Sequence, residues 1–109
     1  MNTMVFISQP MRDIEPSEIA KQQLEAFDDY CRKYPDKNFQ LINPYKVPDR
    51  QLEMSHLIGN HSVKMLGDSI SNMSYADVVL FLKGWENYPG CRIEHKVCTY
   101  YNVPIEYAR

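Results

Sequence analysis

Short apolar runs alternate along this chain with longer segments in which apolar residues recur every three or four positions. A continuous apolar run is typical of a strand covered on both faces, whereas the three- and four-residue spacing is typical of an amphipathic helix. Four runs predict strands, at residues 4–8, 39–42, 77–82 and 103–107. The last run contains Pro104, which is tolerated in an edge strand.

Three segments between these runs predict helices. The first begins at Pro16, which suits a first helical turn, and ends in the polar stretch 34–38. Its apolar stripe consists of Ala20, Leu24, Phe27, Cys31 and Tyr34. The second helix runs from about residue 60 to 73, and its expected core face consists of Val63, Leu66, Ile70 and Met73. The third covers residues 91–101.

Strands that alternate with helices form right-handed βαβ units and a parallel sheet. We therefore expect an α/β fold, a three-layer Rossmann- or flavodoxin-like domain with a parallel sheet of four to five strands. A chain of 109 residues has room for one such domain, covering residues 1–109. In sheets of this kind ligands bind outside the carboxyl ends of the strands. Segments 8–13 and 83–94 should line that crevice.

Composition excludes several classes of partner. A net charge of −2 gives no electrostatic footprint for a nucleic-acid polymer or an anionic membrane, and the longest apolar run is far too short to span a bilayer. The N-terminus lacks the layout of a signal peptide. Three cysteines and three histidines show no metal-ligand spacing. We expect a cytoplasmic protein with reduced thiols, no metal and no cofactor, whose ligand is a small molecule.

Glu94 is the most informative single residue. At 100° per residue it shares one arc of the third helix with four apolar residues, Ile93, Val97, Cys98 and Tyr101. A carboxylate on a buried stripe is costly unless it is paired, hydrogen-bonded or used in chemistry. Glu94 also lies within about one turn of the predicted helix start, which should keep it ionised. It is either a nucleophile or a structural glutamate that pairs with Arg92 or caps the helix.

The loop at residues 84–90 leads into that helix. Gly90 lets a ligand approach the backbone, and the amides that follow could hold a phosphate or a hydroxyl. Trp85 offers a flat surface for a base. Together with Gly84 and Tyr88, these are candidate substrate-binding residues. An ordinary turn at Gly90 and a packing role for Trp85 are the alternatives.

The loop after the first strand supplies polar groups to the same crevice. Ser8 and Gln9 can form hydrogen bonds, and Arg12 could hold a phosphate through two parallel bonds. A solvated arginine after a proline turn is the alternative. Asp77 lies at the start of its strand, opposite the crevice, where a structural role in the preceding turn is favoured. Asp68 lies on the second helix, where most aspartates are exposed.

The two ends of the chain carry a resemblance to a known family. VFISQPMRD at the start and MSYADVVLFLKGWENYPGCRIEHKVCTYYNVPI at the end resemble small phage and bacterial proteins related to nucleoside 2-deoxyribosyltransferases. The resemblance covers the first dozen and the last forty residues, and the middle matches in element order. The linked pattern of strand, GWE loop, glycine and glutamate is its most specific part.

The resemblance implies a reaction and roles for individual residues. In the wider superfamily a glutamate after a glycine-bearing turn attacks the sugar anomeric carbon, displaces a base, and passes the glycosyl group to another base or to water. Glu94 matches that nucleophile, and Gly90 matches the preceding glycine. Arg12 and the backbone of Gln9 and Pro10 match the loop that wraps the sugar or a 5′-phosphate.

Three positions depart from the superfamily pattern. Characterised members commonly carry a tyrosine late in the first strand that orients the nucleophile, and Phe6 stands there in this chain. A serine that contacts phosphate in the nucleotide hydrolases falls at Tyr88. A catalytic helix aspartate that protonates or orients the base would lie near Asp68, but its spacing to Asp77 is one residue off.

Three hypotheses about function follow. The first is an enzyme that hydrolyses or transfers the N-glycosidic bond of a nucleoside or nucleotide, with Glu94 as nucleophile. The second is a non-catalytic module that senses or sequesters a nucleotide, which the changes at Phe6 and Tyr88 favour. The third is a small structural or interaction subunit. The short chain and its C-terminal tyrosines, Tyr100, Tyr101 and Tyr107, also predict a homodimer or larger homo-oligomer.

Overall fold

A computed structural model describes residues 2–47 and 60–108 of the chain. The elements along the chain, including the short 3₁₀ helix η3, are β1 (Thr3–Ser8), α1 (Pro16–Lys33), β2 (Phe39–Leu41), α2 (His61–Met73), β3 (Val78–Phe81), η3 (Trp85–Asn87), α3 (Pro89–Tyr100) and β4 (Ile105–Tyr107). All four strands and three helices lie where the apolar pattern predicts them, with ends shifted by one or two residues. The largest consequence of these shifts is at α3, which begins two residues earlier than predicted.

The four strands form one parallel sheet in the order β2-β1-β3-β4. This is the strand order at the start of a flavodoxin-like sheet. The predicted α/β class with a parallel sheet is therefore confirmed. Because β1 is a central strand, its carboxyl end lies between β2 and β3, where the order of connections reverses and ligands bind in such sheets.

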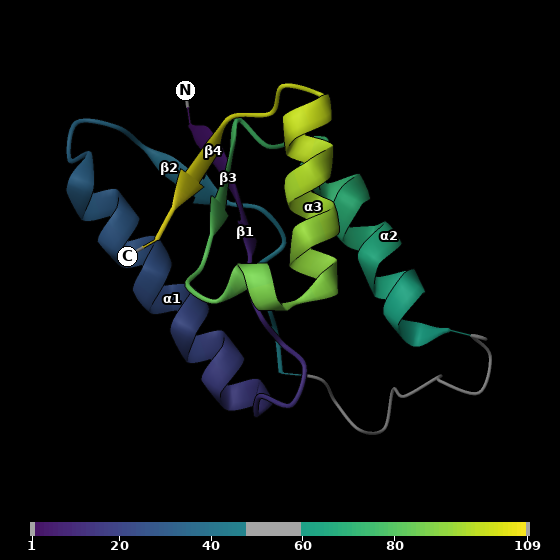
Figure 1. Cartoon of the computed structure of the whole chain (residues 1–109). Coiled ribbons are helices and arrows are strands. Elements are labelled where there is room, and N and C mark those ends of the chain that lie inside the picture. The colour runs from purple at the N-terminus through teal and green to yellow at the C-terminus, as the bar shows by residue number, and fades with distance from the viewer. Residues whose placement is uncertain (1, 48–59, 109) are drawn as a thin grey trace.

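Helices cover both faces of the sheet and complete three layers (Figure 1). On one face, Tyr30 of α1 packs with Val5, Ile7, Leu80 and neighbouring apolar residues. On the other face, Met73 of α2 and Cys98 of α3 pack with alternate strand residues, among them Phe6, Val79 and Phe81. The amino ends of all three helices and the carboxyl end of β1 lie at the same end of the molecule (Figure 1).

The helix faces that point into the core differ in part from the predicted stripes. On α1 the buried residues are Ile19, Gln23 and Tyr30, while Leu24 is exposed. This face is rotated by about one position from the predicted stripe, and it includes Gln23, whose side chain bonds to Gln9 and to the backbone of Tyr45. On α2, Val63 is exposed and Met73 is fully buried.

The α3 helix shows the same kind of difference. Its buried residues are Cys91, Glu94 and Cys98, which follow one another at three- and four-residue steps. Ile93 and Tyr101 were predicted to share this face, but both are exposed. Glu94 therefore lies in the middle of the buried arc, as predicted, with different neighbours.

Two turns fix the ends of β3. Asp77 accepts a hydrogen bond at Oδ2 from the backbone N–H of Met4 at 2.8 Å, so the structural role favoured for this residue is what the structure shows. At the other end, Gly84 has a φ of 91°, a left-handed conformation that glycine adopts without strain. A Cβ atom at Gly84 would lie 3.8 Å from Cγ of Pro10, so this turn packs against the loop after β1.

Candidate functional site

A cavity of about 740 Å³ opens at the carboxyl ends of β1 and β2. Its walls come from the end of β1 and the loop after it, the first half of α1, the loop after β2, one side of α2 and the first two turns of α3. Ser8, Gln23, Asn43, Ser69 and Glu94 each represent one of these walls. Five segments therefore meet at the position where an open parallel sheet binds its ligands.

Glu94 lies at this cavity and is almost entirely buried, with 6% of its surface exposed. The Ser8 hydroxyl donates a hydrogen bond to Oε1 of Glu94 over 2.7 Å. Ser8 is itself 1% exposed, so both partners lie away from bulk water. The prediction that Glu94 is buried in the crevice, near the loop after β1, is confirmed. The crevice was expected at the carboxyl ends of the first and third strands, but the cavity lies at those of β1 and β2, and no residue of β3 lines it.

Burial raises the pKa of the Glu94 carboxyl above its ordinary value, while the Ser8 hydroxyl and then that of Ser69 act in the opposite direction. The expectation that the helix start keeps Glu94 ionised stays a prediction, because the direction of the pKa shift alone does not set the protonation state. Because α3 begins at Pro89, Glu94 lies in the second turn, and the favourable effect of a helix terminus falls off within the first turn. Desolvation is the larger effect here.

A thiol adjoins the carboxyl. Cys91 is 4% exposed, lines the same cavity, and lies one turn before Glu94 on the buried side of α3. Burial raises the pKa of its thiol; the Ser8 hydroxyl lowers it, and the negative charge of Glu94 raises it further. Ser8 therefore influences both ionisable groups at the base of the cavity.

The Gln9 side chain uses both its amide nitrogen and its amide oxygen in hydrogen bonds to α1. Its Nε2 donates to the carbonyl of Ile19 over 3.1 Å, and its Oε1 accepts from Nε2 of Gln23 over 3.0 Å. Gln23 in turn accepts from the backbone N–H of Tyr45 over 2.7 Å. These bonds join the loop after β1, helix α1 and the loop after β2, and both Gln9 and Gln23 line the cavity.

The remaining predicted residues divide into two groups. Arg12, Asp68, Tyr88 and Gly90 line the cavity with Ser8, Gln9 and Glu94. Arg12 and Asp68 are exposed, and Asp68 forms an ion pair with Lys64 at 2.7 Å. At Gly90 an added Cβ would meet no atom within 4 Å, so the backbone there faces open space.

The second group does not line the cavity. Pro10 is buried against Gly84, and both residues serve the packing of two turns. Trp85 packs against Phe81 and stacks on His95, with ring centroids 4.2 Å apart and planes inclined by 15°. One face of the indole is therefore covered within the protein, and the packing role described as the alternative for Trp85 is the one that the structure shows.

Several cavity residues are absent from the sequence-based set, among them Gln23, Tyr45, Ser69 and Cys91. A signal for the loop after β2 was available, because β1 and β2 are neighbours in a flavodoxin-like order and their carboxyl ends share one edge. Ser69 and Gln23 gave no such signal, since polar residues on a helix are ordinarily exposed.

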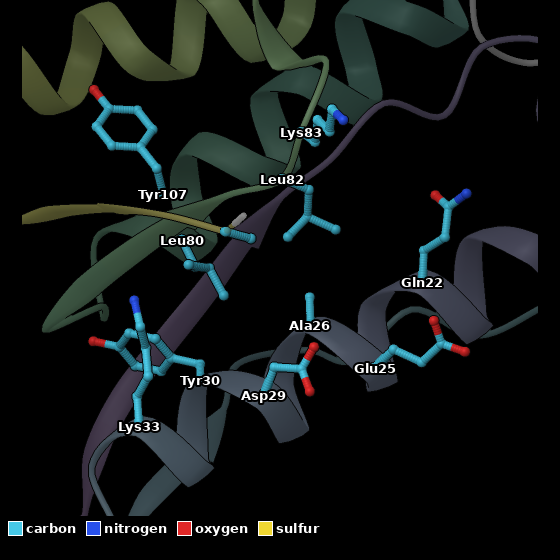
Figure 2. A pocket seen from close by; sticks show the side chains of 11 residues that line it. Gln22, Glu25, Ala26, Asp29, Tyr30, Lys33, Leu80, Leu82, Lys83 and Tyr107 are labelled. Atoms are coloured by element: carbon cyan, nitrogen blue, oxygen red, sulfur yellow. The ribbon is translucent and has the colours of Figure 1, made fainter.

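A second cavity, of about 480 Å³, lies between α1 and the carboxyl ends of β3 and β4. Figure 2 shows its lining, with side chains of α1 on one side and Leu80, Leu82 and Tyr107 on the other. Its charged lining residues, Glu25, Asp29, Lys33 and Lys83, are all exposed. Because no buried ionisable carboxyl lines this cavity, it lacks the feature that distinguishes the first.

Other features of the described residues bear on the predicted chemistry. Within residues 2–47 and 60–108, no group of three His, Cys, Asp or Glu side chains is placed to hold a metal ion; His56 lies outside these ranges. All three cysteines are free thiols. Among the described helices, none is long and apolar enough to cross a membrane.

Comparison of the chain with protein-family models, with curated proteins and with solved structures gave no match. The case for a function therefore rests on the residues that line the cavity and on the chemistry open to them.

Proposed function

We propose that this chain binds a nucleoside or nucleotide in the cavity at the carboxyl end of β1 and cleaves or transfers its N-glycosidic bond. Glu94 is the proposed nucleophile. The observation that carries the proposal is the burial of this carboxyl, at 6% exposure, on the wall of a 740 Å³ cavity. A buried carboxylate with no structural ion pair is costly to keep, which favours a chemical use. Among the described residues, no ion pair of Glu94 with Arg92 or another cation is present.

The proposed reaction has two steps. A carboxylate oxygen of Glu94 attacks the anomeric carbon C1′, a C1′–O bond forms, and the C1′–N bond breaks. The bonding electron pair leaves with the base, which takes up a proton from solvent. In the second step water or a second base attacks C1′ and loses a proton to solvent, while the C1′–O bond to Glu94 breaks and its electron pair returns to the carboxylate. The nucleophile is a side chain, so the proposed reaction needs no cofactor.

The cavity has groups suited to each part of such a ligand. Arg12 and Lys46 carry positive charge on its lining and could hold a 5′-phosphate, while Ile14, Ile42 and Leu66 offer apolar surface to a base. A volume of about 740 Å³ lies within the usual range for small-molecule sites, which is about 300–1,000 Å³.

The second candidate is a module that binds a nucleotide without turning it over. Two observations favour it: burial raises the pKa of Glu94, and the Asp68 carboxylate is engaged by Lys64 instead of being free to act on a base. Both candidates share the same cavity and the same class of ligand. For either, we propose a cytoplasmic protein that associates with further copies of itself and binds neither nucleic-acid polymers nor membranes.

Incubation of the protein with a panel of nucleosides and nucleoside 5′-monophosphates, followed by mass spectrometry, separates the two candidates. Release of free base supports the enzyme. An intact nucleotide that co-purifies with the protein and survives incubation supports the binding module. If no member of the panel is cleaved and none binds, both candidates are wrong.

A further inference from the structure

Ser8 is a buried hydroxyl residue at the end of a central strand, next to Glu94. It ends the central strand β1, where it pairs in register with Phe81 of β3, and its carbonyl accepts a hydrogen bond from Leu82 over 3.0 Å. Only 1% of its surface is exposed. The sheet therefore holds the backbone of Ser8 in place, and bulk water does not compete for hydrogen bonds with its Oγ atom.

The Ser8 hydroxyl lies near two ionisable groups, the Glu94 carboxyl and the Cys91 thiol. A serine carries a single O–H donor, and in the structure that donor is used on Oε1 of Glu94 over 2.7 Å. Ser8 therefore forms a hydrogen bond with one carboxyl oxygen of Glu94, Oε1, and forms none with the other, Oε2. Phe6 and Ile7, the other β1 residues that line the cavity, carry no hydroxyl.

We propose that Ser8 is the positioning residue of the site: it fixes the rotation of the Glu94 carboxyl and favours its ionised form. The part of this proposal that concerns attack on a sugar rests on the proposed function. Ser8 touches the carboxyl and is not itself assigned to contact reacting atoms. Its hydrogen bond stabilises the charged carboxylate against the cost of burial, because a charge-assisted bond is stronger than one between neutral groups.

Ser69 offers an internal comparison. It lies on α2, is half-buried, and also lowers the pKa of Glu94, but less than Ser8 does. A hydroxyl on the sheet and a hydroxyl on a helix therefore approach the same carboxyl from two walls of the cavity. If the sheet hydroxyl sets the state of the carboxyl, loss of Ser8 must have the larger effect.

The first test measures Glu94 directly and needs no substrate. In protein labelled with ¹³C at the glutamate side-chain carboxyls, we expect Ser8→Ala to raise the pKa of Glu94 by about one unit, the equivalent of a tenfold change in the ionised-to-protonated ratio. Ser69→Ala should raise it by less. Ser8→Thr keeps the hydroxyl and should restore the wild-type value, whereas Ser8→Cys keeps the volume with a weaker donor and should lie in between.

The outcomes are distinct. The proposal is overturned if Ser8→Ala leaves the pKa of Glu94 unchanged, or if Ser8→Thr and Ser8→Ala shift it equally, because volume and not the hydroxyl would then matter. Amide spectra of each variant establish that it is folded. Ser8→Cys keeps the test decisive if removal of the side chain in Ser8→Ala unfolds the protein.

Turnover supplies the second test, on whichever nucleoside or nucleotide of the panel the wild-type protein cleaves. Ser8→Ala should lower kcat by about tenfold to a hundredfold with little change in KM, and it should move the acid limb of the kcat profile to higher pH. A wild-type protein that cleaves nothing but shows the Ser8-dependent titration defeats the proposed function alone. Cleavage with unchanged kcat and titration in Ser8→Ala defeats the role of Ser8 alone.

Discussion

Nε2 of Gln23 on α1 donates a hydrogen bond to Oε1 of Gln9, in the loop after β1, over 3.0 Å, and both amide side chains are buried. The same Gln23 accepts a bond from the backbone of Tyr45, so one side chain joins two loops that border the cavity. Gln23, a polar residue on the core face of α1, therefore connects two segments of the cavity wall.

Removal of the Gln23 side chain should destabilise the protein. Gln23→Ala leaves the buried Oε1 of Gln9 and the part-buried N–H of Tyr45 without this partner. The loss of a buried partner costs about 1–3 kcal/mol. We expect a fall of that order or somewhat more in the free energy of unfolding measured by urea titration. Gln22→Ala is the matched control, because its bond to Glu18 is exposed and long at 3.4 Å. Equal losses in the two variants would contradict the role given to Gln23.

Glu94→Gln should change the pH dependence of stability. The folded-state pKa of Glu94 is raised by burial, so the folded protein holds its proton more tightly than the unfolded chain does. The contribution of Glu94 to the free energy of unfolding is fully present below its pKa in the unfolded chain, about 4.3, and is lost as the pH rises through its pKa in the folded protein. Each unit of difference between these two pKa values corresponds to about 1.4 kcal/mol. Glutamine does not titrate and should remove this loss.

The measurement is the free energy of unfolding of both proteins from acid to mildly alkaline pH. The variant should gain on the wild type as pH rises and should match or exceed its stability at neutral pH. A variant that is less stable than the wild type at neutral pH by the same margin as at acid pH would indicate a glutamate whose role is purely structural.

Much of the fold could be predicted because it depends on patterns of many residues. The continuous apolar runs at β1 and β3 and the alternation of strands with helices determine the parallel sheet, and an error at one residue does not change the outcome. The position of Glu94 on the buried side of α3 also followed from helical spacing, although two of its predicted neighbours, Ile93 and Tyr101, proved to be exposed.

The interior of the site could not be predicted in the same way. Whether Gln23 points inward depends on an amide partner in a different loop, and whether Trp85 faces a ligand depends on His95 stacking on it. The pKa of Glu94 depends on its burial and on the hydroxyls of Ser8 and Ser69, which come from two other elements of the fold. Such features are set by single contacts between distant segments.

Arg12→Ala should weaken phosphorylated ligands far more than unphosphorylated ones. Arg12 lies on the cavity lining and its guanidinium can bind a phosphate through two parallel hydrogen bonds. We expect the dissociation constants of nucleoside 5′-monophosphates to rise by about tenfold or more, and those of nucleosides to change little. Calorimetry on matched pairs measures both. Arg92→Ala, at an exposed position outside the cavity lining, is the control, and equal effects from the two variants would rule out a phosphate role for Arg12.

Self-association should occur through exposed aromatic surface at the end of α3. Tyr100 and Tyr101 are 73% and 76% exposed, and Ile93 on the same helix is 44% exposed. Large apolar side chains gathered on one helix favour burial against another copy. Light scattering at micromolar concentration should report a dimer or larger assembly, and the double change of Tyr100 and Tyr101 to lysine should reduce its mass. A wild-type monomer at that concentration would contradict this expectation.

The most direct test of the central claim is the turnover of Glu94→Gln, measured with its ligand affinity on the nucleoside or nucleotide that the wild-type protein cleaves. The amide keeps the shape of the carboxyl but cannot attack an anomeric carbon. Release of free base should fall by several orders of magnitude while the affinity stays within about tenfold. Glu106→Gln is the control, because this carboxyl lies on the α1 side of the sheet, where it accepts a bond from Tyr34, and its loss should leave turnover intact. Unchanged turnover in Glu94→Gln would contradict the proposal that Glu94 is the nucleophile.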